Sequence, residues 1–347
     1  MPNEKNESSP ISNLKSLQIL RAIAATTVVY YHIGAIPHFG SFGVDIFFVI
    51  SGFVMAMVIA NGQDTYQFAV SRLARIVPLY WILTTCLLVV AAVKPSLLNS
   101  TTANFENYLK SIFFIPYFKE NGALNPMLAV GWTLNYEMFF YLCIWLSIFV
   151  ARKHYLALTS ILLISAYLGF GWNTASPVAT SFFHSQLFFE FIFGMLSFEI
   201  YRRNLMKTLH SHVMIFLGIS SYVVMATTET LNPDIDRVMY FGLPSVLLVL
   251  SLTNLEDLIR RKDGSVTKAL TTIGDGSYAT YLSHFFVVVP FHKFDIFNPY
   301  TPIGVSIIVL LCLAVGHLLY KVLDNPLHKY FKHKFLALRP SQQRTGT

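Results

Sequence analysis

Charged residues are scarce in this sequence of 347 residues: 12% are Asp, Glu, Lys or Arg, whereas 54% are hydrophobic. Soluble globular proteins carry about twice that charged fraction, so the composition excludes a single soluble domain with a solvated surface. Cysteine is also scarce, because only Cys86, Cys143 and Cys312 occur, far apart and in separate apolar runs. Neither a disulfide framework nor a metal site is therefore expected. The composition predicts a membrane protein.

Long apolar runs are plentiful by contrast. A membrane-spanning helix needs about 20 mostly apolar residues, and the runs predict about ten such helices. They lie near 17–36, 42–60, 76–93, 132–150, 155–171, 182–200, 212–227, 238–253, 275–291 and 301–322. The runs are continuous and lack the period-two alternation of a membrane barrel. We therefore predict an all-α, polytopic integral membrane protein.

The arrangement of the predicted spans defines one domain and its orientation. No internal repeat or low-complexity linker divides the chain, so we expect an N-terminal tail (1–16), a membrane domain (17–323) and a basic C-terminal tail (324–347). With both termini cytoplasmic, 20 of the 25 Lys and Arg residues lie on the cytoplasmic side, a strong positive-inside pattern. The net charge of +7 therefore indicates orientation and not a nucleic-acid partner.

Two segments are not simple spans. The long outer segment 94–131 contains an apolar, aromatic stretch at 111–118, which is either re-entrant or lies in the membrane interface. At the other end of the chain, the basic stretch 328–335 is expected to lie against anionic headgroups of the inner leaflet.

A few ionisable side chains fall within the predicted spans, where they are costly and by default mark function. They are Arg21, His32, Asp45, Glu137, Glu190 and His284. Arg21 and His32 are eleven residues apart, which is about three helical turns, so they share one helix face about 16 Å apart. In the alternative interpretation, Arg21 extends to the inner interface and His32 bonds to a neighbouring helix.

Asp45 lies just inside the second predicted helix. The connection from the first helix is short, so the two helices are expected to be antiparallel neighbours and Asp45 can meet His32. A carboxylate that accepts a proton from one imidazole nitrogen leaves the other nitrogen free as a base. A purely structural His–Asp hydrogen bond would have the same geometry.

Five separated stretches resemble the successive signatures of the acyltransferase-3 family of membrane-bound sugar O-acyltransferases, most closely its exopolysaccharide O-acetyltransferase branch. They are residues 17–34, 43–53, 68–81, 130–142 and 274–285. The resemblance implies a multi-pass enzyme of the inner membrane that transfers an acyl group, usually acetyl, from cytoplasmic acyl-CoA to a sugar hydroxyl. It implies acetyl-CoA as a donor substrate without a bound cofactor, a saccharide or lipid-linked saccharide acceptor, and polysaccharide biosynthesis machinery as a partner.

The resemblance also implies roles for single residues. Arg21 and His32 match the family's catalytic signature, with His32 as the general base that Asp45 orients, since attack by a sugar hydroxyl needs a positioned base. Arg72 and Arg75 match the pair assigned to the acyl-CoA side, and arginine forks suit phosphate oxygens. Without the resemblance, the second pair is an ordinary positive-inside feature.

Acceptor-binding residues are expected around the fourth and ninth predicted spans. Trp132, Tyr136 and Glu137 combine aromatic rings with a carboxylate, a combination that suits sugars, although an interfacial aromatic belt has the same composition. His284 is assigned either to the same cavity or to a structural role. We assign no role to Glu190 or Asp324.

Two other classes of protein fit part of the pattern. A transporter or flippase would use the buried ionisable residues as a substrate or proton path, but no inverted repeat is visible in the sequence. A membrane scaffold without activity would need none of the paired ionisable residues. The prediction is therefore an O-acyltransferase, with the transporter as the alternative.

Overall fold

A computed structural model describes residues 14–98, 101–170, 176–232, 236–294 and 296–338. These residues form helices joined by loops and contain no β-strand, in agreement with the all-α prediction. The helices are α1 (Lys15–Ile33), α2 (Gly43–Ala60), α3 (Thr65–Val93), α4 (Phe105–Ile112), α5 (Trp132–Ala151), α6 (Tyr155–Phe170), α7 (Pro177–Phe183), α8 (Leu187–Arg202), α9 (Ser211–Leu231), α10 (Leu243–Asn254), α11 (Glu256–Arg261), α12 (Ser265–Asp275), α13 (Ser277–Phe294), α14 (Pro302–Leu319) and α15 (Asn325–Ala337).

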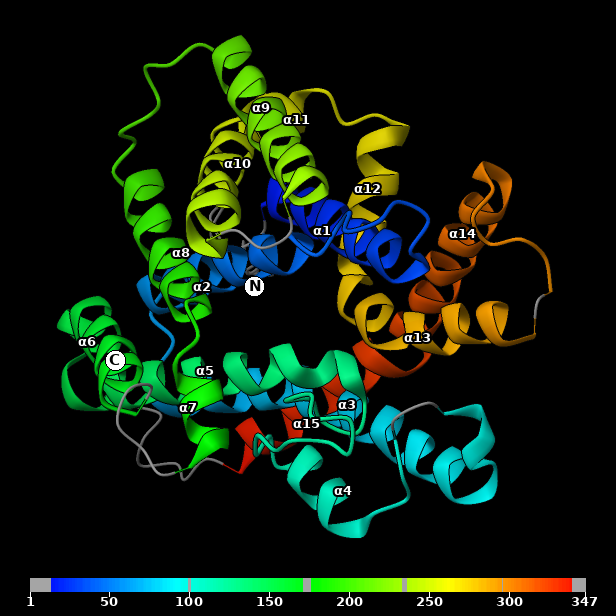
Figure 1. Cartoon of the computed structure of the whole chain (residues 1–347). Helices are drawn as coiled ribbons and strands as arrows, with labels where there is room; N and C mark the ends of the chain where they lie inside the picture. Colours follow the sequence, from blue (N-terminus) through cyan, green and yellow to red (C-terminus); the bar gives the residue numbers. More distant parts are fainter. Residues whose placement is uncertain (1–13, 99–100, 171–175, 233–235, 295, 339–347) are drawn as a thin grey trace, which may run out of the picture.

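Helices that are far apart in the sequence lie side by side in the bundle (Figure 1). One group brings together α1, α2, α8, α9 and α10, and α12 packs along α1. In the other group α3 lies against α5 and against the C-terminal α15. Because α13 contacts both α1 and α3, it joins the two groups.

The backbones of α2 and α8 meet at two glycines. A Cβ added at Gly52 would contact the carbonyl oxygen of Phe191, and one added at Gly194 would contact the carbonyl oxygen of Val49. Small residues allow membrane helices to approach this closely. Gly52 and Gly194 therefore set the distance between α2 and α8.

We expect Gly52→Ala to lower the free energy of unfolding by about 1–3 kcal/mol, because the added methyl overlaps backbone atoms that cannot rotate away. Gly169→Ala is the matched control, since a Cβ there meets nothing within 4 Å. The thermal midpoint of each purified variant in detergent measures the effect. Equal midpoints for the two variants would contradict the assigned packing role.

The helix that corresponds to the third predicted span, 76–93, begins earlier than predicted. α3 begins at Thr65, after a capping box in which the Asp64 side chain accepts from the Gln67 backbone N–H at 2.9 Å. Arg72 and Arg75 consequently lie about two and three turns inside α3, and not at its entrance. Sequence reasoning missed this start because polar and charged residues fill the first turns.

Five helical stretches are long and apolar enough to cross a membrane. They are Gly43–Ala60, Thr65–Val93, Ala129–Phe170, Ser211–Leu231 and Pro302–Ala337, and Val238–Asn254 is apolar but shorter. The structure is thus consistent with a helical membrane protein. The count of ten spans and the cytoplasmic position of both termini stay predictions.

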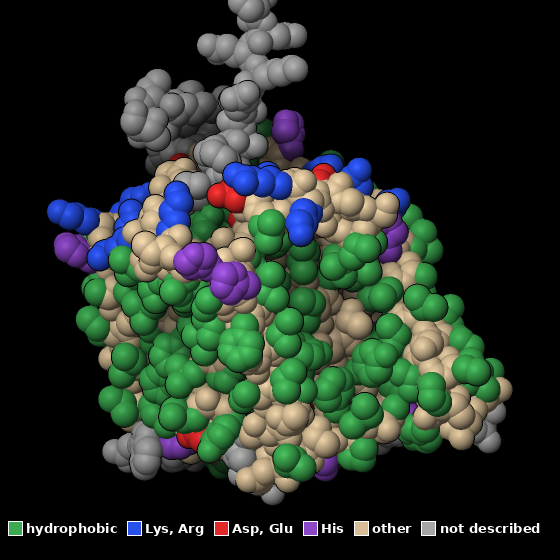
Figure 2. Space-filling model, turned by 90° about the horizontal axis from the view of Figure 1, so that it is seen from above, with side chains coloured by type: hydrophobic (Ala, Val, Ile, Leu, Met, Phe, Trp, Pro, Cys, Tyr) green, Lys and Arg blue, Asp and Glu red, His purple; other side chains and the backbone are tan. Residues whose placement is uncertain are grey.

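The surface has a charged end and a hydrophobic band, as expected for a membrane protein. In Figure 2, Lys and Arg side chains gather at one end of the molecule, and a broad band of hydrophobic side chains lies below them. Large apolar side chains are exposed on the helices, among them Phe149, Phe216 and Ile303. Such a continuous apolar surface is expected where a protein faces lipid.

The predicted outer segment 94–131 contains the short helix α4 and a loop with exposed apolar side chains. Phe114 in this loop stacks on Tyr80 of α3, with ring centroids 5.1 Å apart. The segment is therefore attached to the bundle, and its re-entrant and interfacial interpretations stay predictions.

The predicted tails are described only in part. Residues 1–13 of the tail 1–16 and residues 339–347 of the tail 324–347 lie outside the described residues. The remainder of the C-terminal tail forms α15, which packs on α3, and the Tyr66 hydroxyl donates to the Phe335 carbonyl oxygen at 2.6 Å.

Candidate active site

A cavity of about 330 Å³ lies between the two helix groups and contains most of the predicted charged site residues. Along α2 its lining extends from Val44 to Val58, a rise of about 21 Å, so the cavity is long and narrow. Its polar and charged lining residues are Arg21, Ser51, Arg72, Arg75, Thr133, Glu137, Tyr141, Ser277, Tyr278, Tyr281 and His328.

Three arginines converge on one part of this cavity. Arg75 forms an ion pair with the buried carboxylate of Asp324 at 2.7 Å, and its guanidinium lies 5.2 Å from the Tyr278 ring centroid. Arg21 and Arg72 have only neutral hydrogen-bond partners among the described residues, Gln18 at 3.4 Å and Ser71 at 3.3 Å. Two guanidinium groups therefore keep most of their donors free for an anion.

Glu137 lines the same cavity as the arginines, one turn inside α5. Its Oε1 accepts hydrogen bonds from the Ser51 hydroxyl at 3.0 Å and from the Tyr141 hydroxyl. The bond from Ser51 joins α2 and α5 across the cavity, whereas the bond from Tyr141 lies within α5. Both bonds fix the position of a carboxylate in the cavity that the arginines also line.

His32 pairs with His284. The Nδ1 atom of His32 lies 2.9 Å from the Val28 carbonyl oxygen and 3.1 Å from Nε2 of His284. His284 is fully buried, and its own Nδ1 lies 3.3 Å from the Thr280 carbonyl oxygen. The rings belong to α1 and α13, which pack together.

The hydrogen-bond network assigns the tautomer of each ring. A carbonyl oxygen only accepts, so Nδ1 of both His32 and His284 must carry a proton. The single Nδ1–H of His32 is then shared between the Val28 carbonyl oxygen and Nε2 of a neutral His284. As a result, Nε2 of His32 bears a lone pair, and it has no hydrogen-bond partner among the described residues. An imidazole in this state can act as a general base.

Tyr281 lies between the cavity and the histidine pair. Its hydroxyl is held by Thr133 at 2.9 Å and by the Val130 carbonyl oxygen at 3.0 Å. Its ring lies 5.9 Å from Phe47 and 6.0 Å from His284, between centroids. Tyr281 was not predicted as a site residue, because an aromatic residue in an apolar helix carries no distinguishing sequence signal.

Comparison with known proteins identifies the family. Residues 14–321 match the family model described as an acyltransferase domain. The chain belongs to the acyltransferase-3 family. It is therefore an acyltransferase, and the resemblance inferred from the five sequence stretches is confirmed.

Several curated relatives of the family are similar over much of the chain. The exopolysaccharide production protein ExoZ of Rhizobium meliloti is 31% identical over 83% of this chain and 89% of its own length. The O-acetyltransferase OatA of Staphylococcus aureus is 25% identical over 95% of this chain, which spans 60% of that protein. The putative membrane-bound transacylase BcsY of Komagataeibacter xylinus is 29% identical over half of this chain. No solved structure matches significantly.

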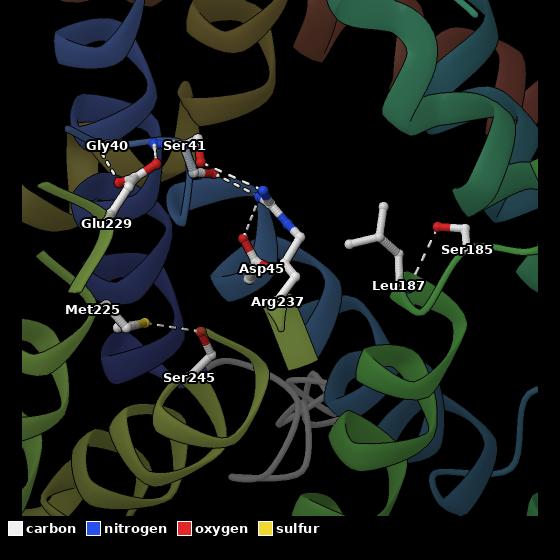
Figure 3. A network of polar contacts seen from close by, with 9 residues as sticks. All are labelled: Gly40, Ser41, Asp45, Ser185, Leu187, Met225, Glu229, Arg237 and Ser245. Atoms are coloured by element: carbon white, nitrogen blue, oxygen red, sulfur yellow. Dashed lines mark hydrogen bonds and ion pairs between the residues drawn. The ribbon is translucent and has the colours of Figure 1, made fainter. Parts of the chain in front are cut away.

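In this member of the acyltransferase-3 family, the prediction that Asp45 contacts His32 is wrong. Asp45 is fully buried and its Oδ2 accepts from Arg237 at 2.6 Å, as Figure 3 shows. His32 instead bonds to Val28 and His284. Arg237 lies between α9 and α10 in the sequence, and only the fold brings its guanidinium to α2.

Arg237 and Asp45 belong to a network that holds the loop between α1 and α2. Arg237 also donates to the Ser41 carbonyl oxygen at 3.1 Å, and Glu229 of α9 accepts from the backbone N–H groups of Gly40 and Ser41 at 2.7 and 2.9 Å (Figure 3). Gly40 has a φ of +111°, which favours glycine. The network thus fixes the C-terminal end of α1 and the N-terminal end of α2.

Glu190 lies close enough to Asp45 and Arg237 for the charges of both to act on it. It is fully buried, and its carboxylate oxygens have no hydrogen-bond partner among the described residues. The cation that acts on Glu190 is therefore Arg237.

The predicted acceptor-binding residues do not form one cluster. The Tyr136 ring stacks on Phe182, with ring centroids 4.5 Å apart. The neighbouring Glu137 instead lines the cavity with the arginines. Trp132 packs edge-on against Tyr136, at 5.8 Å between centroids. His284 is enclosed beside His32. The assignment of these four residues to the acceptor therefore stays a prediction, with Tyr136 in a packing environment.

Proposed function

We propose that this acyltransferase transfers an acetyl group from cytoplasmic acetyl-CoA to a hydroxyl of an exported or envelope polysaccharide, or of its lipid-linked precursor. The observation that carries the proposal is the long cavity with three arginines in its lining and the His32–His284 pair beyond Tyr281. The names of the ExoZ and OatA relatives support the saccharide acceptor.

The arginines are the proposed donor-binding groups. The diphosphate and 3′-phosphate of CoA are anions, and a planar guanidinium binds phosphate oxygens in a bidentate manner. Arg72 and Arg21 supply the free donors, while the ion pair with Asp324 orients Arg75. The extended thioester arm of the donor then follows the narrow cavity along α2 toward Phe47 and Tyr281.

His32 is the proposed general base. Its Nε2 removes the proton of the acceptor hydroxyl as the oxygen attacks the thioester carbonyl carbon. The tetrahedral intermediate collapses, the C–S bond breaks, and the protonated His32 returns the proton to the leaving thiolate. The products are the acetyl ester and CoA. His284 positions His32 by accepting its Nδ1–H, the task predicted for Asp45.

The test is acetyl transfer by the purified full chain in detergent. Supplied with acetyl-CoA and the polysaccharide of its host, the protein should release CoA and form acetyl esters in equal amounts. Absence of both products, with folded protein and the host's own polysaccharide present, would contradict the proposal. Turnover in micelles would exclude transport as the sole activity, because no compartments exist there.

We expect Arg72→Ala to raise the KM for acetyl-CoA by about tenfold or more, since a hydrogen bond to a charged group contributes about 1.5–3 kcal/mol. Because Arg72 does not reach the reacting atoms in this scheme, kcat should change much less. Steady-state kinetics measure both. Arg261→Ala removes an exposed arginine outside the cavity and should leave KM unchanged. A fall in kcat alone would argue against a donor-binding role.

A further inference from the structure

A second cavity, of about 620 Å³, lies away from the candidate active site, between the start of α6 and the end of α8. Its lining comes from residues 153–157 and 196–205, so it opens at the end of the bundle where the sequence places its lysines and arginines. Nothing in the proposed reaction uses this cavity.

The lining is positively charged. Lys153, Arg202 and Arg203 contribute three cations, and Glu199 is the one carboxylate among the lining residues. Glu199 pairs with both arginines, at 2.7 Å to Arg202 and 3.5 Å to Arg203. The arginine side chains remain 51% and 67% exposed, and a guanidinium has five N–H donors. Lys153 is exposed and has no carboxylate partner among the described residues. The cavity therefore keeps a net charge of +2.

Apolar side chains adjoin these cations. Leu196 and Leu205 are 42% and 64% exposed, and Leu156 and Ile200 line the cavity with them. Tyr155 also lines the cavity, and its hydroxyl oxygen is buried without a hydrogen-bond partner among the described residues. A ligand that matches this surface has phosphate oxygens at one end and hydrocarbon at the other.

We propose that this cavity binds the headgroup of an anionic phospholipid. The phosphate lies between Lys153 and Arg203, and the acyl chains follow Leu196 along α8 into the bilayer. Basic pockets between helices at the cytoplasmic surface suit such headgroups. A zwitterionic lipid fits less well, because its ammonium group meets a cavity that is already positive. Free phosphate shares the charge but makes no use of the leucines.

The test compares lipids and variants of the full chain. Purified protein is stripped of lipid in detergent and mixed with phosphatidylglycerol or phosphatidylcholine of the same chain length, and bound lipid is counted by native mass spectrometry. We expect phosphatidylglycerol to be retained about tenfold more than phosphatidylcholine. Lys153→Gln combined with Arg203→Gln should abolish this preference.

The matched control removes one arginine and one lysine from another exposed site, as Arg261→Gln with Lys262→Gln, and should keep the preference. If the double variant at the cavity does not fold, Lys153→Gln alone is measured, with a smaller loss expected. Equal retention of the two lipids, or an equal loss in the control, would overturn the proposal. It would also be overturned if inorganic phosphate raised the thermal midpoint as much as phosphatidylglycerol does.

Discussion

Replacing His32 with alanine should lower acetyl transfer at least about 10²- to 10⁴-fold, the contribution of a general base, while the protein stays in the membrane at near-normal abundance. The reason is local: Nε2 of His32 is the unprotonated nitrogen of the histidine pair that accepts no hydrogen bond among the described residues, and its loss leaves the acceptor hydroxyl without a base. Acetyl esters formed by the purified variant, and acetyl content of the polysaccharide in cells, measure the effect.

His38→Ala is the matched control, because His38 is exposed on the loop after α1 and should be dispensable. Full acetylation by His32→Ala would refute the base assignment. We expect His32→Ala to fold, since His32 is only partly buried. The Val28 carbonyl oxygen lies within α1 and keeps its backbone hydrogen bond there.

Asp45→Asn should destabilise the protein by about 3 kcal/mol while leaving acetyl transfer per folded molecule within a few-fold of wild type. Loss of the carboxylate leaves the Arg237 guanidinium without its ion-pair partner. Asp45 is fully buried, whereas the Arg237 side chain is 31% exposed, and breaking a pair with a buried member from one side is destabilising. The thermal midpoint in detergent and the specific activity of the folded fraction separate the two effects.

Asp263→Asn is the control for the loss of an ion pair as such. Asp263 pairs with Lys15 at 2.7 Å, but both side chains are about one-third exposed, so its removal should cost less than about 1 kcal/mol. An Asp45→Asn protein of normal stability and no activity would instead favour the catalytic role expected from the sequence.

The donor end of the candidate site is built on long-range contacts. Arg75 comes from α3 and Asp324 from the turn before α15, and their ion pair joins segments that are 249 residues apart. Packing of α15 on α3 brings the two together. Asp324, to which the sequence analysis assigned no role, thereby becomes the residue that orients Arg75.

Helix periodicity explains which site predictions agree with the structure. Arg21, Arg72 and Arg75 line one cavity, and the spacing within α3 already places its two arginines on a shared face. His32 lies on the same helix as Arg21, but it does not line this cavity. Its partner is His284, which lies on the other side of the Tyr281 ring. Within a single helix, therefore, relative positions follow from the sequence alone.

Partners on different helices did not follow from the sequence. The adjacency of α1 and α2 in the sequence predicted that Asp45 lies beside His32. In the structure Asp45 pairs with Arg237, and His32 bonds to His284. Two neighbouring helices leave the rotation of each about its own axis undetermined. That rotation is set by packing against third helices, such as the close contact of α2 with α8 at Gly52.

The sequence by itself determined the membrane class, the helical content, the family and the residues that bear charge in an apolar chain. These properties follow from composition and from periodicity within single segments, which local physics decides. Tertiary structure alone decided which charges meet: the ion pairs Asp45–Arg237 and Arg75–Asp324 and the His32–His284 hydrogen bond. Each depends on the packing of helices that are distant in sequence, because a buried polar group takes whichever partner the fold brings within reach.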